Sequence, residues 1–512
     1  MTTYKLLDFL LPMVLIQNLA PVPIKPFVLL VMSLFIYSTS GWQGLCFMVI
    51  AASVTYVGAI YIDQQAEMEH ATDKKSESGR TRREQLRRKR RRMLYAVLLI
   101  CFGLLCALKY VPQMPYYIGL ICERLFGIKV EWASFEIPLG VSFYTFALMG
   151  YLLDVYNRKY HAERNYIRLL LFTCYFPLLI QGPICRYNDL APQLAKESSV
   201  PLEETSRGLL RILWGLFKKK VVADRAVILV NAIFKPQAAV GGTLGVVGVL
   251  FYSLQQYADF SGGIDIVLGI SQMMGIYPTE NFRQPYFATS LGDFWRRWHI
   301  TLGSWMRDYV FYPFALSKPM QILSKTLKKR GRKTLSRTIP AALGNILVFA
   351  IVGLWHGRTS NFIAWGLYNG IILAISALAE PFLMKHRTNG HAWFKVIRTF
   401  IIVNIGWFFD RSASLGQALH MIGNIFTKPE IGQLFSGFFT RFSLKPTDYL
   451  ILAVSVIIMF VISMIHEKGK RISTWLGQKS RVQRAVIVFL IFFGILWFAV
   501  PQTNTGFMYA MY

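Results

Sequence analysis

The segment Asn281 to Phe314 reads NFRQPYFATSLGDFWRRWHITLGSWMRDYVFYPF and concentrates tryptophan, arginine and histidine in a chain that is mostly apolar. At helical spacing, one face of this segment carries Trp295, Trp298, His299, Leu302 and Met306. Gly292 and Asp293 are typical of a helix start, and Pro313 is typical of a helix stop. We therefore expect one amphipathic helix that carries a histidine on its apolar face.

This predicted helix has two interpretations. In the first, it lies at the membrane interface with its tryptophans at the level of the lipid headgroups, and His299 only packs. In the second, His299 takes part in chemistry. Helical spacing alone favours the first interpretation, because periodicity is a weak guide to a residue's role. Asp293 and Arg297 are four residues apart, where an ion pair within a helix is geometrically allowed.

The composition of the whole chain indicates a membrane protein. Of its 512 residues, 54% are hydrophobic and only 16% are charged. Apolar runs recur along the chain, and many are long enough to cross roughly 30 Å of hydrocarbon. We predict an all-α, polytopic integral membrane protein with about eleven transmembrane helices, and with interfacial or re-entrant helices between them. A single domain is expected, divided into N-terminal spans and a basic loop (1–92), a motif-bearing core (93–410) and C-terminal spans (411–512).

The charge pattern predicts topology rather than nucleic-acid binding. The net charge is +29, from 56 Lys and Arg against 27 Asp and Glu. The basic residues cluster between apolar runs, and cytoplasmic loops of membrane proteins share this bias. We expect cytoplasmic loops next to anionic lipid at 63–92, 318–337, 385–398 and 466–484. Nucleic acid is excluded as a partner because no basic stretch is interleaved with stacking aromatics in a polar domain.

The six cysteines do not form a recognisable site. None belongs to a CxxC motif, and most lie inside apolar runs: Cys46, Cys101, Cys106, Cys122, Cys174 and Cys185. We interpret them as small core residues rather than as disulfide partners or metal ligands. No metal site is predicted.

Three segments place polar or helix-breaking residues among apolar ones. Residues 169–186, LLLFTCYFPLLIQGPICR, contain two prolines and a glycine, which membranes tolerate only against protein or a polar cavity. Residues 209–225, LLRILWGLFKKKVVADR, are amphipathic and basic, which favours the inner membrane interface. Asp259 and Asp265 lie in an apolar segment. Intramembrane carboxylates are often functional, and pairing with a nearby arginine is an equal alternative.

Two of the eight histidines differ from the rest. We expect a solvated or unremarkable role for those in polar or mixed segments: His70, His161, His386, His391, His420 and His466. His299 and His356 are instead embedded among tryptophan and glycine in apolar surroundings. A neutral imidazole both donates and accepts hydrogen bonds, as a general base requires. The chain has no GxSxG, HExxH, P-loop or dinucleotide motif, which excludes metalloprotease, phosphoryl-transfer and redox mechanisms.

Several motifs together resemble a known family. FWRRWHITLGSWMRDYVFYPF, followed farther along by GLWHG, resembles the membrane-bound O-acyltransferase superfamily. Further stretches resemble its bacterial polysaccharide O-acetyltransferase branch and occur in family order between residues 90 and 410: IPLGVSFYTFALMGYLLDVY, FPLLIQGPICR, GLFKKKVVADR, YADFSGGIDIVLGISQMMGI and ENFRQPYFATSLGDFWRRWHITL. The resemblance implies the alginate O-acetyltransferase type of membrane subunit, which is related to the teichoic-acid D-alanyl transfer protein.

The resemblance implies roles for particular residues. His356 becomes the expected catalytic base and His299 its partner, with a base of this kind contributing ~10²–10⁴-fold in rate. An apolar wall at Trp355 would exclude the water that hydrolyses a thioester. Arg296 and Arg297 would steer the phosphates of the acyl donor, and anchoring to lipid phosphate is an equal alternative. The expected donor-binding residues are Trp295, Arg296, Arg297, Trp298, Trp355 and Asp259.

The resemblance also implies substrates and partners. An acyl group, most simply acetyl, would pass from acetyl-CoA or an acyl-pantetheine carrier in the cytoplasm to a hydroxyl of a cell-surface polysaccharide or of a partner protein. No tightly bound cofactor is expected, the location is the bacterial cytoplasmic membrane, and an extracytoplasmic acetyltransferase is an implied partner. D-alanyl transfer to teichoic acid is one alternative. A transporter or a non-catalytic scaffold for polysaccharide export is another, although the two halves show no internal repeat of hydropathy.

Overall fold

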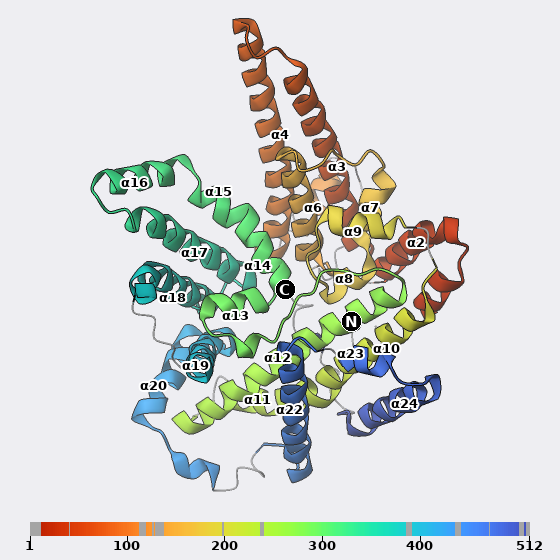
Figure 1. Cartoon of the computed structure of the whole chain (residues 1–512), viewed down its shortest axis with the longest axis vertical. Coiled ribbons are helices and arrows are strands. Elements are labelled where there is room, and N and C mark those ends of the chain that lie inside the picture. Colours follow the sequence, from red (N-terminus) through yellow and green to blue (C-terminus); the bar gives the residue numbers. More distant parts are fainter. Residues whose placement is uncertain are drawn as a thin grey trace. The chain divides into compact units, whose positions relative to one another are not determined.

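The computed structural model describes residues 12–39, 41–111, 119–124, 127, 138–196, 199–235, 240–385, 392–435, 442–470, 472–500 and 506–507. Helices make up nearly all of these residues (Figure 1). Strand-type pairing within them occurs as an isolated antiparallel bridge between Phe282 and Trp298. The predicted all-α class is therefore confirmed for the described part of the chain.

The helices group into two compact units. The N-terminal unit is built from Tyr4–Thr205 and Ile270–Pro278, and the C-terminal unit mainly from Ser206–Gly269 and Thr279–Tyr512. The N-terminal unit contains η1 (Val22–Ile24), α2 (Lys25–Ser38), α3 (Trp42–Ala71), α4 (Glu77–Tyr110), α6 (Val141–Tyr156), α7 (Tyr166–Cys174), α8 (Phe176–Gln181) and α9 (Tyr187–Leu194). The division into one domain with three parts stays a prediction.

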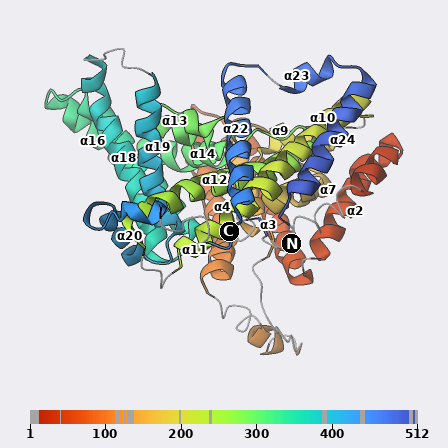
Figure 2. The same ribbon diagram turned by 90° about the horizontal axis from the view of Figure 1, so that it is seen from below.

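The C-terminal unit holds the motif-rich segments. Most residues of α10 (Leu202–Leu216) and α12 (Gly242–Met273) belong to it. It further contains the π-helix η2 (Phe217–Ala223), α11 (Asp224–Ile233), η3 (Pro285–Phe287), α16 (Lys318–Lys329), α17 (Leu335–His356), α18 (Ser360–Lys385), α19 (Ala392–Arg411), α20 (Leu415–Thr427), η5 (Ile431–Leu434), α22 (Pro446–Glu467), α23 (Ile472–Gly477) and α24 (Arg481–Phe498). Within this unit α17 packs on α18, and α18 on α19 (Figures 1 and 2).

Helix length and composition support insertion in a membrane. Among the described residues, five helices are long and apolar enough to cross a bilayer: α3, α4, α17, α18 and α22. Shorter apolar helices are α2, α6 and α24. At 1.5 Å per residue, a helix of about 20 residues spans the hydrocarbon core. A helical membrane protein is thus confirmed, and the count of about eleven spans stays a prediction.

The most basic segment is helical, contrary to the loop expected at 63–92. α3 continues to Ala71 and α4 begins at Glu77, so these helices form the long hairpin at the top of Figure 1. Ser76 caps α4 by accepting a hydrogen bond from the backbone N–H of Gly79 at 3.1 Å. The buried carboxylate of Glu69 accepts from Arg87 at 2.7 Å and from Arg90 at 2.8 Å. These ion pairs offset the repulsion between the many Arg and Lys side chains of α4, which would otherwise disfavour the helix.

The interrupted segment 169–186 is broken as predicted. α7 ends at Cys174, α8 starts at Phe176, and residues 182–186 are not helical before α9 begins. Protein groups satisfy the break: the N–H of Phe176 donates to Ser33 Oγ at 3.3 Å, and Tyr175 donates to Ser271 Oγ at 3.0 Å. The irregular backbone therefore lies against protein, as membrane burial requires.

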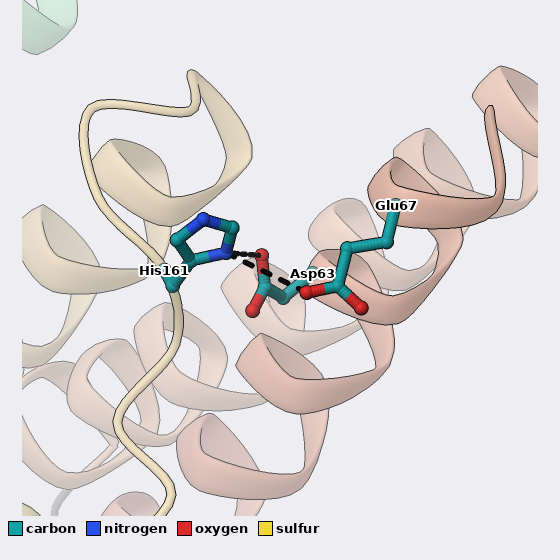
Figure 3. A group of neighbouring side chains, drawn as sticks. All are labelled: Asp63, Glu67 and His161. Atoms are coloured by element: carbon teal, nitrogen blue, oxygen red, sulfur yellow. Dashed lines mark hydrogen bonds and ion pairs between the residues drawn. The ribbon is translucent and has the colours of Figure 1, made fainter. Parts of the chain in front are cut away.

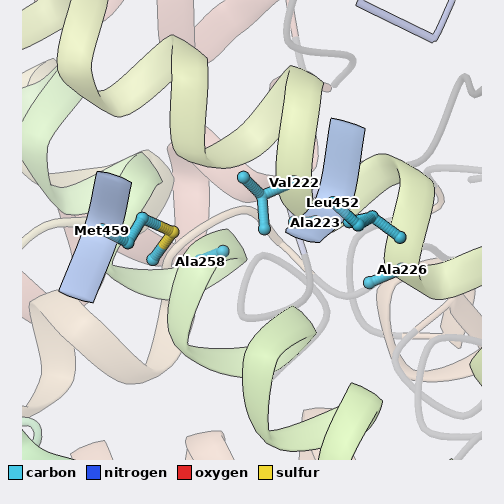
Figure 4. Close-up of a cluster of buried hydrophobic side chains, with 6 residues drawn as sticks. All are labelled: Val222, Ala223, Ala226, Ala258, Leu452 and Met459. Carbon is cyan, nitrogen blue, oxygen red and sulfur yellow. The ribbon is translucent and has the colours of Figure 1, made fainter. Parts of the chain in front are cut away.

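Buried apolar side chains join the central helices of the C-terminal unit. Figure 4 shows a cluster in which η2, α11, α12 and α22 meet through Val222, Ala223, Ala226, Ala258, Leu452 and Met459. Nearby, a Cβ placed on Gly262 of α12 would lie 2.9 Å from the carbonyl oxygen of Gly215 in α10. The two backbones therefore touch, which holds the segment around Asp259 against η2.

Candidate active site

The tryptophan-rich segment is broken at its histidine. α13 (Leu291–Arg297) and α14 (Ile300–Met306) are separate helices, followed by the π-helix η4 (Arg307–Phe311) and α15 (Tyr312–Ala315). Trp298 is extended, and His299 is left-handed with φ 48° and ψ 52°. The prediction of one continuous helix is therefore wrong. Pro313 does not stop the segment, because it lies in the first turn of α15, where a missing N–H costs little.

A second segment of chain causes the break. The N–H of Arg283 donates to the carbonyl oxygen of Arg297 at 2.9 Å, and the N–H of Ile300 donates to that of Asn281 at 3.0 Å. Together with the bridge from Phe282 to Trp298, these bonds pair residues 281–283 with 297–300. These bonds supply hydrogen-bond partners for backbone N–H and C=O groups that would bond to each other within a continuous helix. Trp295, Trp298 and His299 consequently do not share one helical face.

The first helix of the segment is held by local caps. Its N-cap is Ser290, whose Oγ accepts from the N–H of Asp293 at 3.1 Å, so the helix starts slightly before the predicted Gly292. The ion pair that helical spacing allows is present, with Arg297 Nε 3.1 Å from Asp293 Oδ2. Arg297 also binds Glu467 at 2.8 Å. Arg296 is 72% exposed, so its guanidinium is the accessible cation of the two.

His299 is buried and tightly surrounded. It is 4% exposed, and its ring packs edge-on against Phe260 with centroids 4.9 Å apart. Its Nδ1 lies 3.2 Å from Oδ1 of Asn281. Burial lowers the pKa of His299 to about 3, because the charged imidazolium is desolvated there. The imidazole is therefore neutral at physiological pH.

His356 is the last residue of α17 and is 6% exposed. Its ring meets Trp355 at 5.0 Å, Phe362 at 6.2 Å and Trp365 at 4.9 Å. Phe362 and Trp365 are brought in by the close packing of α17 on α18. A Cβ on Gly353 would lie 2.6 Å from the carbonyl oxygen of Phe362, so only glycine permits this approach.

Aromatic rings connect the two histidines. From His299 the path continues through Phe260 to Trp298, with centroids 6.4 Å apart. Trp298 lies 5.5 Å from Trp407 of α19. The last steps are the stacked pair of Trp407 and Trp365 at 6.4 Å and the contact of Trp365 with His356.

Sequence reasoning missed three members of this path, namely Phe260, Trp365 and Trp407. All three are buried. Trp365 follows the GLWHG motif closely, but a tryptophan in an apolar helix is usually a core residue, so its position was not a distinguishing signal. The predicted Trp295 joins the same group: it contacts Trp365 at 5.6 Å and donates from Nε1 to Asn369 Oδ1 at 3.2 Å.

The lysines of the basic segment 209–225 are buried in protein and do not lie on the surface of an amphipathic helix, while its placement at the inner membrane interface stays a prediction. Lys218, Lys219 and Lys220 are all at most 3% exposed. Carboxylates compensate their charge and make burial tolerable. Lys218 binds Asp265 at 2.6 Å, and Lys220 binds Asp224 at 2.6 Å.

The two apolar-segment carboxylates are therefore ion-paired. Asp259 binds the ammonium of Lys219, which also lies 3.1 Å from Asp224. Asp265 binds Arg211 at 3.0 Å in addition to its lysine. Both carboxylates thus pair with a nearby cation, which was the alternative to a functional role. The partner of Asp259 is a lysine rather than the expected arginine. A donor-binding role for Asp259 stays a prediction.

A separate group of side chains in the N-terminal unit has the spacing of metal ligands. Asp63, Glu67 and His161 bring their ligand atoms within 4.8 Å of one another (Figure 3). Arg164 lies 3.1 Å from Asp63 and 3.7 Å from Glu67, so an arginine already occupies the carboxylates. We interpret the group as an ion-pair network between α3 and the chain after α6. His161 is 79% exposed, as expected for a solvated histidine, whereas His386 and His391 lie outside the described residues.

The segment that contains both histidines is similar to known proteins. Residues 162–415 match the model of the membrane-bound O-acyltransferase family. Over 327 residues the chain is 36% identical to a probable alginate O-acetylase of Pseudomonas syringae pv. tomato, covering 63% of this chain and 59% of that protein. It is 29% identical over 322 residues to a peptidoglycan O-acetyltransferase of Helicobacter pylori, covering 56% of each.

A third relative carries a different acyl chemistry in its name. The chain is 28% identical over 281 residues to a teichoic acid D-alanyltransferase of Bacillus subtilis, covering 53% of this chain and 67% of that protein. The matches to the alginate relatives span 59% of the first of them, which is less than two thirds of its length. The matched family region includes α10 to α19, and with them both histidines and every ring on the path between them.

Proposed function

Residues 162–415 belong to the membrane-bound O-acyltransferase family, and from this premise we propose that the chain is a membrane O-acetyltransferase acting on a cell-surface polysaccharide. The observation that carries the proposal is the pair of buried histidines joined by packed aromatic rings. A buried imidazole at each end suits proton transfer in a dry site. The relatives named for alginate and peptidoglycan acetylation support acetyl as the acyl group.

The proposed reaction is acyl transfer from a thioester to a hydroxyl. His356 takes the proton of the acceptor hydroxyl while its oxygen attacks the thioester carbonyl carbon. The tetrahedral adduct collapses with cleavage of the C–S bond. The leaving thiolate then takes the proton from the imidazolium, which returns His356 to its neutral form. Each step conserves protons within the site and needs no tightly bound cofactor.

The aromatic surroundings of His356 favour transfer over hydrolysis. Trp355, Phe362 and Trp365 pack against its ring and leave little room for bulk water. Excluding water matters because water competes with the hydroxyl for the thioester. On the donor side, the exposed Arg296 offers its guanidinium to phosphates of coenzyme A or of a pantetheine arm.

We further propose that the acyl group crosses the bilayer because the donor's thioester reaches His356 past His299. α17 starts at Leu335, just after the basic residues 318–333, and continues as one helix to His356. Twenty-one steps of about 1.5 Å amount to about 32 Å, the thickness of the hydrocarbon core. His356 would then meet an outer acceptor, and the cytoplasmic thioester would approach past His299. A structure in lipid with both imidazoles at the same depth would contradict this arrangement.

The proposed setting is the bacterial cytoplasmic membrane, with an extracytoplasmic acetyltransferase as a partner that receives the acetyl group or completes its transfer. D-alanyl transfer to teichoic acid is the second candidate, supported by the named Bacillus subtilis relative at lower identity. Both reactions use the same thioester chemistry at the same histidines. They differ in the acyl group and in the final polymer.

Mass spectrometry of surface glycans tests the proposal. Cells with and without this chain are compared for O-acetyl esters and for D-alanyl esters on every extractable envelope polymer. We expect loss of O-acetyl esters when the chain is absent and their return on complementation. Loss of D-alanyl esters alone favours the second candidate. Unchanged esterification combined with loss of exported polymer would support a transporter or scaffold and overturn an acyltransferase.

A further inference from the structure

Asn281 is the residue that holds His299 in place. It is fully buried in the segment before η3. Its backbone carbonyl accepts from Ile300, and its side-chain Oδ1 accepts from both the N–H and the hydroxyl of Thr301, at 3.0 and 2.9 Å. The same Oδ1 lies 3.2 Å from Nδ1 of His299. One amide oxygen thus organises the whole start of α14.

These contacts decide which imidazole nitrogen carries the proton. The backbone N–H of Thr301 is an obligatory donor, so the atom of Asn281 that faces it must be the acceptor oxygen and not the NH₂ group. A carbonyl oxygen only accepts hydrogen bonds. Nδ1 of His299, which faces that same oxygen, must therefore be the donor. In a neutral imidazole the lone pair is then on Nε2.

We propose that Asn281 is a positioning residue that locks His299 in the Nδ1–H form, so that Nε2 accepts a hydrogen bond from an N–H or O–H group of a substrate. This inference rests on the proposed acyl transfer. On the proposed path of the donor past His299, the group with the required chemistry is an amide N–H of a pantetheine arm. The hydroxyl of an acceptor has the same chemistry, and its binding at Nε2 would contradict that path.

The amide is chemically suited to this role in a way that a carboxylate is not. A carboxylate hydrogen-bonded to Nδ1 stabilises the imidazolium, as in a Ser-His-Asp triad. The neutral amide of Asn281 orients the ring without adding negative charge. His299 is thereby set to accept a hydrogen bond and to stay uncharged. The left-handed backbone of His299 turns the ring toward this amide and out of the helical face predicted from spacing.

Nitrogen NMR of the full chain in lipid nanodiscs tests the proposal directly. The protein is labelled with ¹⁵N-histidine, and the signals of His299 are identified by their loss in His299→Gln. We expect the wild type to show a protonated Nδ1 and an unprotonated Nε2. Asn281→Leu, which removes the acceptor at similar size, should populate the Nε2–H form. Asn281→Asp, which keeps an acceptor oxygen, should retain Nδ1–H.

A matched control separates this effect from general loss of a buried amide. Asn424 of α20 is also buried and donates to the carbonyl oxygen of Val240 at 2.9 Å. Asn424→Leu should leave the His299 signals unchanged. A wild-type His299 with its proton on Nε2, or an Asn281→Leu spectrum identical to that of the wild type, would overturn the proposal.

Kinetics add a second readout. We expect Asn281→Leu to lower kcat/KM by about tenfold or more, with partial rescue in Asn281→Asp. A raised KM for the thioester identifies the pantetheine amide as the group bound at Nε2, and a raised KM for the acceptor identifies the hydroxyl. If the wild type transfers no acyl group but shows the Nδ1–H form of His299, the proposed function is wrong, and the positioning of His299 by Asn281 is still supported. If the wild type is active and neither Asn281→Leu nor Asn281→Asp changes kcat/KM, the positioning role of Asn281 is wrong and the proposed function is unaffected.

Discussion

The ammonium of Lys219 is ion-paired with the carboxylate of Asp259, and the next residue along α12, Phe260, packs its ring against His299. Lys219 also lies 3.1 Å from Asp224, and both carboxylates are buried. A charge cluster that looks basic in the sequence therefore holds in place the helix segment that supports the candidate active site.

Lys219→Met should strongly destabilise the protein. The substitution nearly keeps the length of the side chain. It leaves the buried carboxylate of Asp259 without its cation, while Asp224 keeps Lys220, and the loss is about 3–5 kcal/mol. Thermal unfolding in detergent measures the effect, and Lys428→Met, on an exposed residue of the C-terminal unit, is the control. Equal melting temperatures for the two variants would show that the ion pairs do not stabilise the fold.

His356→Ala should abolish acyl transfer and leave expression and membrane insertion close to normal. Removing a general base costs ~10²–10⁴-fold in rate. Acylated product is quantified by mass spectrometry in cells that carry the variant in place of the wild type. His420→Ala, on an exposed histidine, should keep full activity. Wild-type levels of product from His356→Ala would show that this imidazole is not the base.

Gly366→Ala should disrupt the packing of α17 on α18. A Cβ at this position would press on the carbonyl oxygen of Phe349 and lie 3.1 Å from the Cα of Gly353. The two helices must then separate, which moves His356 away from Trp365 and lowers both folded yield and activity. Gly423→Ala, where a Cβ would meet nothing within 4 Å, should be tolerated. Size-exclusion profiles and product yield are compared, and equal behaviour of the two variants contradicts the close contact.

Acidification should destabilise the protein through His299. Its pKa is lowered to about 3 by burial, against an ordinary value of 6.5. Between these values the unfolded chain binds a proton that the folded chain does not, so stability falls as pH falls below about 6.5, by up to roughly 1.4 kcal/mol per pH unit. His299→Gln removes this contribution. The difference between the melting temperatures of wild type and variant should therefore change between pH 7 and pH 5, whereas a constant difference indicates a solvated imidazole.

The basic segments 63–92, 318–337, 385–398 and 466–484 should all face the cytoplasm. They are the densest Lys and Arg segments, and such segments are retained on the inner side. Single cysteines introduced there, in a background without native cysteines, are tested with a membrane-impermeant thiol reagent on intact cells and after lysis. Labelling is expected only after lysis. Strong labelling of any one segment in intact cells means that the predicted path across the membrane is wrong.

Part of this protein could be predicted from local sequence. The all-α membrane class follows from composition and from apolar runs, since a helix satisfies its own backbone within one segment. The Asp293–Arg297 pair and the broken segment 169–186 also depend on neighbours a few residues away. His299 and His356 were found for a similar reason, because each imidazole lies beside tryptophan and glycine in the chain itself.

Tertiary structure alone decided the rest, because the decisive contacts join distant segments. The helix break at His299 exists because residues 281–283 pair with 297–300, and periodicity carries no signal of that pairing. The lysines of η2 are buried because Asp259 and Asp265 approach them from another helix. The rings of Trp365 and Trp407 meet only after α18 and α19 pack together. Burial and hydrogen-bond partners depend on which segments meet in space, and that is a property of the folded chain.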